Sequence, residues 1–117
     1  LLLTLFAMLI DQNDNKSDLF VNFFEKLASS SKGTAAFHLL RKSPVVLVTC
    51  PYVGDYLEIS FQRITFDLSG EQEKDTLAIT QKITSAFENV IRKYPEQYFW
   101  MHRRWRARPQ EDPEDIY

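Results

Sequence analysis

The chain has 117 residues, of which 44% are hydrophobic and 26% are charged, and its formal net charge is −2. This length corresponds to one domain or part of one, and the composition is that of an ordinary soluble globular chain. A single cysteine, Cys50, excludes an internal disulfide framework and fits a reducing compartment.

The chain begins with the apolar run LLLTLFAMLI, in which residues 6–10 predict a buried strand. The run is too short to cross a bilayer, which requires about 20 apolar residues. It also lacks the basic leader and the small-residue cleavage site of a signal peptide. Because the run starts abruptly at Leu1, we expect a strand cut near its start, and therefore a fragment of a longer protein.

The next elements are a polar loop, an extended segment and a helix. Residues 11–18 (DQNDNKSD) are rich in turn formers, and residues 19–24 (LFVNFF) predict a short extended segment. Residues 29–42 predict a helix, because serines at its start can cap the first N–H groups and two basic residues suit its C-terminal end. Pro44 then ends the helix.

Two strands and a long helix follow. Residues 45–49 (VVLVT) predict a strand that is covered on both faces. Residues 56–66 alternate, and the alternation places three apolar side chains on one face: Leu57, Ile59 and Phe61. The phase changes at Arg63, so we expect a bulge there that keeps both apolar sets inward. Residues 71–95 show the clearest helical spacing, and Pro95 breaks or kinks that helix.

This order of elements predicts an α/β fold, namely the C-terminal half of a mixed sheet covered by helices. A half-sheet of this kind leaves an exposed edge and an uncovered face when it stands alone. The expected architecture therefore supports the fragment interpretation a second time.

Two polar stretches are candidate binding sites. Asp11 and Gln12 directly follow a predicted strand, and ligands bind beyond the carboxyl ends of strands in open α/β sheets. A carboxylate there can orient a hydroxyl, a basic partner or an essential histidine. Gly33 lies in SSSKGTA, where a helix N-terminus can hold an anion. Plainer alternatives are a solvated turn at Asp11, simple capping near Gly33, and a structural role for the helix residue His38.

The distribution of charge argues against a nucleic-acid partner. Residues 92–108 contain six Lys or Arg and one acid, a net charge of +5, whereas residues 110–117 contain four acids and no base, which makes −4. A basic block followed by an acidic tail indicates self-neutralisation or a solvated end. The isoelectric point is about 5.7. With two histidines and one cysteine, no zinc site is predicted.

The sequence YPEQYFWMHRRWRARP resembles the C-terminal signature of the bacterial lipid A biosynthesis acyltransferases, the lauroyl/myristoyl transferase family. The matching positions are Pro95, Glu96, Gln97, Tyr98, Trp100, His102, Arg103, Arg104, Trp105, Arg106, Arg108 and Pro109. MLIDQN resembles the family's strand that ends in a polar pair, which places Asp11 and Gln12. VNFF resembles its Val-x-Phe-Phe-Gly segment, but Glu25 stands where glycine is usual, which puts the local turn in doubt.

KGTAAFHLLRKSPVVLV resembles the family's Gly-x-Ala helix and the strand after it, so the resemblance covers essentially the whole chain. It implies a glycerolipid-acyltransferase-like fold and an enzyme at the cytoplasmic face of the bacterial inner membrane. Such an enzyme would transfer an acyl chain from acyl carrier protein to a hydroxyl of a lipid A precursor, without a further cofactor. Relatives instead acylate phosphatidylinositol mannosides.

The family's catalytic dyad is a histidine base and an acidic residue that orients it, with four residues between them. Ser43 stands in the acid's place after His38, and Ala107 stands there after His102, so neither histidine completes a dyad. We therefore expect the dyad upstream of Leu1 and no activity of this chain alone. Residues 1–117 would form the C-terminal part of a single acyltransferase domain that ends in the acidic tail.

The segment YFWMHRRWRARP, residues 98–109, interleaves aromatic and basic side chains. If it continues the helix past Pro95, Trp100 and Arg104 lie at i and i+4, close enough for a cation–π contact. We predict that three of its arginines meet anionic headgroups or lipid A phosphates: Arg103, Arg104 and Arg106. The alternatives are an aromatic core with solvated or tail-paired arginines, and a non-enzymatic module that binds anionic partners.

Overall fold

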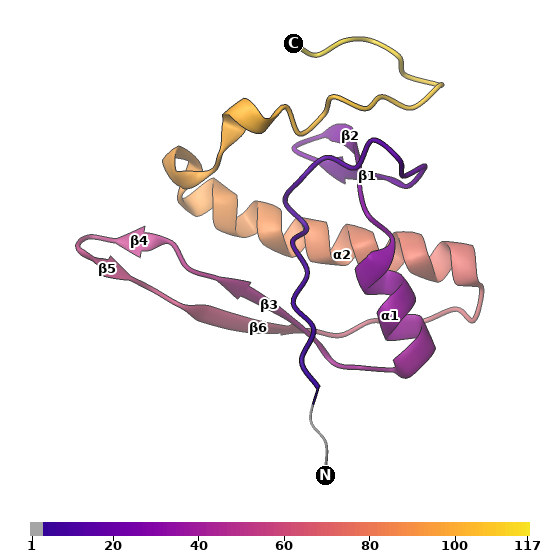
Figure 1. Cartoon of the computed structure of the whole chain (residues 1–117), viewed down its shortest axis with the longest axis horizontal. Coiled ribbons are helices and arrows are strands. Elements are labelled where there is room, and N and C mark those ends of the chain that lie inside the picture. Colours follow the sequence, from indigo (N-terminus) through magenta and orange to yellow (C-terminus); the bar gives the residue numbers. More distant parts are fainter. Residues whose placement is uncertain (1–3) are drawn as a thin grey trace.

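The structure, a computed structural model, describes residues 4–117, and Leu1 at the start of the apolar run lies outside them (Figure 1). The strands are β1 (Phe20–Phe23), β2 (Lys26–Ser29), β3 (Val45–Thr49), β4 (Tyr52–Val53), β5 (Tyr56–Leu57) and β6 (Ser60–Ile64). The α-helices are α1 (Gly33–Arg41) and α2 (Gln72–Lys93), followed by the 3₁₀ turns η1 (Pro95–Gln97) and η2 (Trp100–His102). The chain is thus a small mixed α/β structure.

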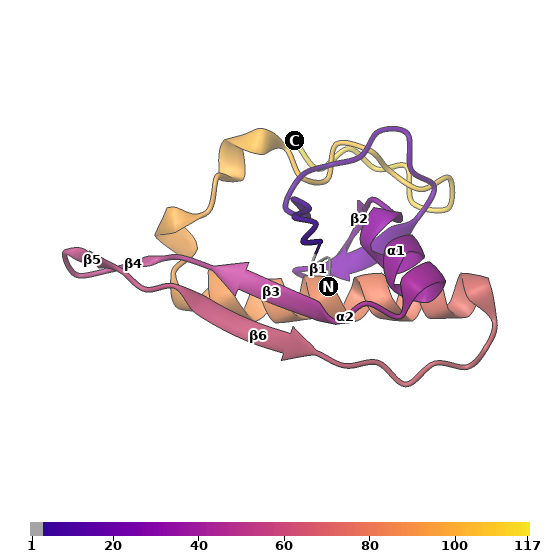
Figure 2. The same cartoon turned by 60° about the horizontal axis from the view of Figure 1, so that its bottom comes forward.

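The strands of the described part of the chain form three separate antiparallel pairs, β1–β2, β3–β6 and β4–β5, and not one sheet. Helix α2 runs between the β1–β2 hairpin on one side and the β3–β6 pair on the other, with α1 packed across it (Figures 1 and 2). The C-terminal segment returns past the β1–β2 hairpin (Figure 1). The helix is therefore the common support for both hairpins.

The apolar positions of α2 recur at helical spacing and supply both hydrophobic clusters of the molecule. The first cluster contains Ala35, Ile64, Ile79 and Ile83 as its buried members. The second contains Phe23, Ala28 and Ile91, with Phe87, Tyr98 and Trp105 packed against them. The helix predicted from this spacing is confirmed, and it joins α1 and β6 to one cluster and the β1–β2 hairpin to the other.

Residues close to each end of α2 explain where the helix starts and where it stops. At the start, the buried carboxylate of Asp75 accepts hydrogen bonds from the N–H groups of Ser69 and Gly70 at 2.8 and 3.0 Å. The bond from Ser69 is the main cause that holds the pKa of Asp75 below its usual value. At the far end the helix stops at Lys93, just before Pro95, as the sequence predicts.

The β1–β2 hairpin turns through two residues, Phe24 and Glu25, because Phe23 pairs with Lys26 in the register. Both turn residues have left-handed backbone conformations, with φ values of 51° and 63°. Two-residue hairpin turns with φ > 0 at both positions match the twist of the strands but favour glycine. Glu25 keeps the turn that the family's glycine would make, at the cost of backbone strain.

Two predictions for the first part of the chain are wrong: the strand at residues 6–10 and the start of the first helix. Residues 6–10 form no strand, because this extended stretch has no neighbouring strand to pair with in the described structure. Its side chains are also largely exposed and not buried as predicted: Phe6 is 60% and Leu9 85% exposed, although the ring centroids of Phe6 and Phe37 of α1 lie 4.8 Å apart. The helix predicted from residue 29 begins at Gly33, because residues 26–29 pair with β1 as the unpredicted strand β2.

The prediction that β3 is covered on both faces is also wrong. The α2 side of β3 is half-buried, but Val46 and Val48 on the opposite face are 46% and 53% exposed. The β3–β6 register runs unbroken from Val45 opposite Ile64 to Thr49 opposite Ser60, so the bulge expected at Arg63 is absent. The three apolar side chains that precede this position therefore point away from the core and are exposed: Leu57, Ile59 and Phe61. The uncovered face expected of a half-sheet is present.

The turn at Glu25 predicts a stabilising substitution. Glu25→Gly should raise the free energy of unfolding by about 1 kcal/mol, because glycine adopts the left-handed conformation without strain. The measurement is urea unfolding followed by circular dichroism. Lys26→Gly is the matched control: it lies one position further on, inside β2, and should lower the free energy of unfolding by about 0.5–1 kcal/mol. A loss of stability in both variants would contradict the strain at Glu25.

Candidate functional site

The loop that carries Asp11 is held by the C-terminal segment, which we define as residues 98–108. The Tyr98 hydroxyl donates to the backbone carbonyl of Asp11 at 3.0 Å. The backbone N–H of Asn13 donates to Nε2 of His102 at 2.9 Å, and the N–H of Ala107 donates to Oδ1 of Asn13 at 3.2 Å. Three contacts from one segment therefore fix a loop that lies almost ninety residues earlier in the sequence.

The carboxylate of Asp11 is not used by these contacts. Its Oδ1 atom is buried, and no described residue donates a hydrogen bond to it. Buried polar atoms are rarely left without a partner, and those that are merit a functional explanation. An acceptor in this position can take a hydrogen bond from a substrate hydroxyl or from a histidine that acts as a base. Asp11 is thus the residue of the loop that is best suited to chemistry.

Gln12 and Gly33 lie near one another, at the N-terminal end of α1. Gln12 lines a cavity of about 30 Å³, which has room for a water molecule or two. The other lining residues include the hydroxyl-bearing Ser30, Ser31, Thr34, Thr80 and Thr84. Gly33 adjoins this cavity, and its N–H donates to Oγ of Ser31 at 3.2 Å. Of the three predicted pocket residues, Gln12 lines this cavity, whereas Asp11 and Gly33 do not.

A hydrogen bond to a nearby serine accounts for one of the free N–H groups at the N-terminal end of α1. Ser31 accepts the Gly33 N–H, although Lys32 is the residue that flanks the helix and makes no capping contact with its side chain. A Cβ atom on Gly33 would meet Oγ of Ser31 at 3.4 Å, an ordinary contact distance. The glycine is therefore not required by crowding, and its assignment to a substrate pocket stays a prediction.

The C-terminal segment does not continue the helix, so that prediction is wrong. Arg103 follows the η2 turn in a left-handed conformation (φ 56°), which redirects the chain after His102. The predicted contact between Trp100 and Arg104 is replaced by another: the Arg104 guanidinium lies 5.6 Å from the ring centroid of Phe23. Tyr98 and Trp105 pack against Phe23 of β1, Trp100 contacts the ring of Phe24, and Phe99 is 67% exposed, so no helix presents the aromatic side chains on one face.

Arg104 is the buried arginine of this segment, with 3% of its surface exposed. Its guanidinium donates to the backbone carbonyl of Ser29 at 2.6 Å and to Oγ of Ser30 at 2.8 Å. Burial lowers the pKa of Arg104, while the nearby Tyr98 and Asp11 oppose that shift. A side chain held in this way cannot reach a membrane headgroup, so the predicted lipid contact is left to Arg103 and Arg106, which are exposed.

Other side chains of the segment also bind the β1–β2 hairpin. Nε1 of Trp105 donates to the carbonyl of Phe23 at 3.1 Å, and Arg108 donates to the carbonyl of Leu27 at 2.7 Å. Arg108 also forms an ion pair with Asp112 of the acidic tail at 2.5 Å. The alternative of an aromatic core with tail-paired arginines therefore describes Trp105 and Arg108 correctly.

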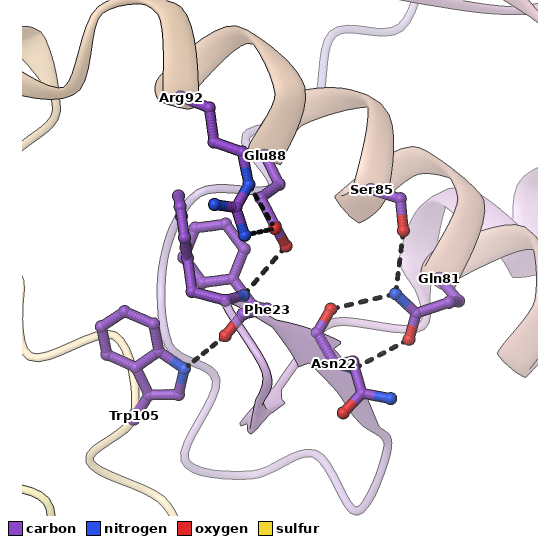
Figure 3. A network of polar contacts seen from close by, with 8 residues as sticks. Asn22, Phe23, Gln81, Ser85, Glu88, Arg92 and Trp105 are labelled. Atoms are coloured by element: carbon purple, nitrogen blue, oxygen red, sulfur yellow. Dashed lines mark hydrogen bonds and ion pairs between the residues drawn. The ribbon is translucent and has the colours of Figure 1, made fainter.

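The hairpin is in turn attached to α2 by polar contacts (Figure 3). The side-chain amide of Gln81 pairs with the backbone of Asn22, accepting its N–H at 2.8 Å and donating to its carbonyl at 2.9 Å. The N–H of Phe24 donates to the carboxylate of Glu88, which is also bound by Arg92. These side chains complete the backbone hydrogen bonds of β1 on its open edge, which explains why so short a hairpin is held in place.

Tyr98 joins the aromatic cluster to the loop. Burial raises the pKa of Tyr98 to about 12, so its hydroxyl stays protonated and remains a donor to the Asp11 carbonyl throughout the neutral range. Its ring lies 6.0 Å from that of Phe23 and 5.9 Å from that of Phe87. The sequence places Tyr98 in the signature but does not predict its contact with the loop. Local sequence does not indicate which distant carbonyl accepts a hydrogen bond from a tyrosine hydroxyl.

Both histidines have contacts with the main chain within residues 4–117. His38 makes a 2.7 Å contact with the carbonyl of Ser43 and packs edge-on against Phe66, which agrees with a structural role. His102 is used by Asn13. No hydrogen bond to a carboxylate is found for either ring among these residues, and no group of three or more potential metal ligands is present in the same range.

The chain matches the family of bacterial lipid A biosynthesis acyltransferases over residues 4–107. The match covers most of the sequence, and it includes both the Asp11 loop and almost all of the C-terminal segment that holds it. The chain therefore belongs to this family, as the resemblance in its sequence predicts, and its general function is that of a lipid A biosynthesis acyltransferase. No curated protein matches the chain.

The buried guanidinium predicts a sharp difference between neighbouring arginines. Arg104→Gln should lower the free energy of unfolding by roughly 3 kcal/mol, because the carbonyl of Ser29 and the hydroxyl of Ser30 lose a charged donor. Arg103→Gln is the matched control and should cost less than about 1 kcal/mol, since the side chain is exposed and contacts only the Tyr117 ring, at 5.6 Å. Thermal and urea unfolding measure both values; equal losses would contradict the structural role of Arg104.

Proposed function

We propose that residues 1–117 form the C-terminal part of a single acyltransferase domain, with residues 110–117 as its acidic tail. The complete enzyme transfers a fatty acyl chain from acyl carrier protein to a hydroxyl of a lipid A precursor. The family membership of the chain supports the reaction class. The observation that gives this part of the enzyme a role is the buried, unpartnered carboxylate oxygen of Asp11 on a loop held by the C-terminal segment.

The chemistry is the transfer of an acyl group from sulfur to oxygen. The acceptor hydroxyl attacks the thioester carbonyl, a general base takes its proton, the carbon–sulfur bond breaks, and the thiol of the carrier leaves with a proton. The family's histidine and carboxylate would supply the base, and we place them upstream of Leu1. Asp11 then orients the acceptor hydroxyl or the histidine, and no further cofactor is needed.

The exposed face of the β3–β6 pair supports a larger domain with a glycerolipid-acyltransferase-like fold. Val46 and Val48 on β3, with Ile59 and Phe61 near and on β6, leave an apolar surface open on the side away from α2. Apolar strand faces of this kind are normally covered by another layer. The remainder of the domain is the covering layer in our proposal.

We place the enzyme at the cytoplasmic face of the bacterial inner membrane. No helix within residues 4–117 is long and apolar enough to span a bilayer. Contact with the membrane surface is assigned to the exposed Arg103 and Arg106, next to the exposed side chains of Phe99 and Met101. Cations attract anionic headgroups, and neighbouring apolar side chains can enter the interface.

Acyl transfer by the full-length protein that contains this chain tests the proposal. We expect it to move an acyl group from acyl carrier protein to a lipid A precursor, whereas the purified 117-residue chain gives no transfer above a no-protein control. Asp11→Asn in the full-length protein should lower kcat by roughly 10² and change the melting temperature little. The matched control is Asp18→Asn on the same polar loop, since Asp18 is exposed and pairs with Lys32.

Three results would contradict the proposal. Transfer by the isolated chain would show that the base lies within it. No transfer by the full-length protein would remove the assigned reaction. A kcat near the wild-type value in Asp11→Asn would make the loop a turn without a part in catalysis.

The two exposed arginines give a prediction for membrane binding. Replacing Arg103 and Arg106 together with Gln in the full-length protein should weaken binding to anionic vesicles by roughly 30-fold at low salt, since each cation contributes about 1 kcal/mol. The loss should shrink at high salt. Replacing Lys16 and Lys74 together with Gln removes the same charge elsewhere and is the control. Unchanged vesicle binding in the first variant would leave both arginines as solvated surface residues.

A further inference from the structure

His102 contacts the loop through an acceptor atom. Nε2 of its ring takes the backbone N–H of Asn13 at 2.9 Å, which requires a neutral imidazole with its proton on Nδ1. The ring is half-buried. Two of the three contacts from the C-terminal segment bind the main chain of the loop: Tyr98 at the carbonyl of Asp11 and His102 at the N–H of Asn13, so together they set the path of the chain on either side of Gln12.

The backbone of His102 is held on both sides. Before it, the η2 turn is closed by a hydrogen bond from the His102 N–H to the carbonyl of Phe99 at 3.2 Å. After it, the left-handed conformation of Arg103 leads directly into Arg104, which is anchored in the carbonyl of Ser29. The acceptor is therefore carried by a stretch of main chain that is anchored on both sides of His102.

We propose that His102 is a positioning residue: it fixes the main chain at Asn13 and so holds Asp11 and Gln12 in the orientation that the acyl transfer requires. This inference rests on the proposed function, because it assigns Asp11 to the site. His102 does not itself exchange a proton with the substrate, since its Nε2 lone pair is occupied by the loop. The role gives a structural reason for the histidine of the C-terminal signature, which contacts the loop and forms no hydrogen bond with a carboxylate within residues 4–117.

The experiment compares three variants of the full-length protein. His102→Leu removes the acceptor, and His102→Gln keeps an acceptor oxygen on a side chain of similar reach. His38→Leu is the matched control, because His38 binds the carbonyl of Ser43 at the end of α1 and not the loop. Two quantities are measured: amide hydrogen exchange of peptides that span residues 11–14, and kcat and KM for acyl transfer.

We expect His102→Leu to speed exchange at residues 11–14 by roughly tenfold, the effect of losing one hydrogen bond, and to lower kcat by a similar factor. His102→Gln should recover most of both losses, and His38→Leu should leave loop exchange unchanged. Wild-type exchange in His102→Leu would overturn the proposal, and so would faster exchange with an unchanged kcat. If the wild-type protein transfers no acyl group, the proposed function fails, while the exchange data still decide whether His102 holds the loop.

Discussion

The hydrogen bonds of Arg104 connect the two ends of this chain. A buried arginine is costly unless its donors are satisfied, and here the acceptors come from Ser29 and Ser30, more than seventy residues earlier. Those serines in turn bind the polar loop: Ser29 donates to the carbonyls of Asp14 and Ser17, and Ser17 donates to the carbonyl of Ser30. One buried cation therefore links the C-terminal segment, the β1–β2 hairpin and the loop that carries Asp11.

The long helix makes this linkage possible. Helix α2 holds β1 through its apolar face and through Gln81 and Glu88, so the hairpin presents fixed carbonyls to the returning chain (Figure 3). The helix ends just before Pro95, and the two 3₁₀ turns then bring Tyr98 and His102 back over the loop. The segment does not continue as a helix, and the two turns place these side chains against the loop.

In the proposed function, this arrangement gives the chain a supporting role in the chemistry. In the conspicuous C-terminal segment, Arg104, Trp105 and Arg108 bind main-chain carbonyls. The residue with a buried, unused acceptor is Asp11, which is inconspicuous in the sequence. Preorganisation of this kind raises the effective concentration of a correctly oriented group, and it does so through residues that never touch the substrate.

The sequence by itself determined the family, the helix from Gln72 to Lys93 and its end before Pro95, and the strand at Val45–Thr49. These features follow from local periodicity, from proline geometry and from a long motif, all of which can be read along the chain. Only the tertiary structure decided that Arg104 is buried while Arg103 and Arg106 are exposed, that one face of β3 is open, and that His102 serves Asn13. The physical reason is that a hydrogen-bond partner can lie anywhere in the sequence once the chain is packed. The partners of Arg104 and His102 lie more than seventy positions away from them.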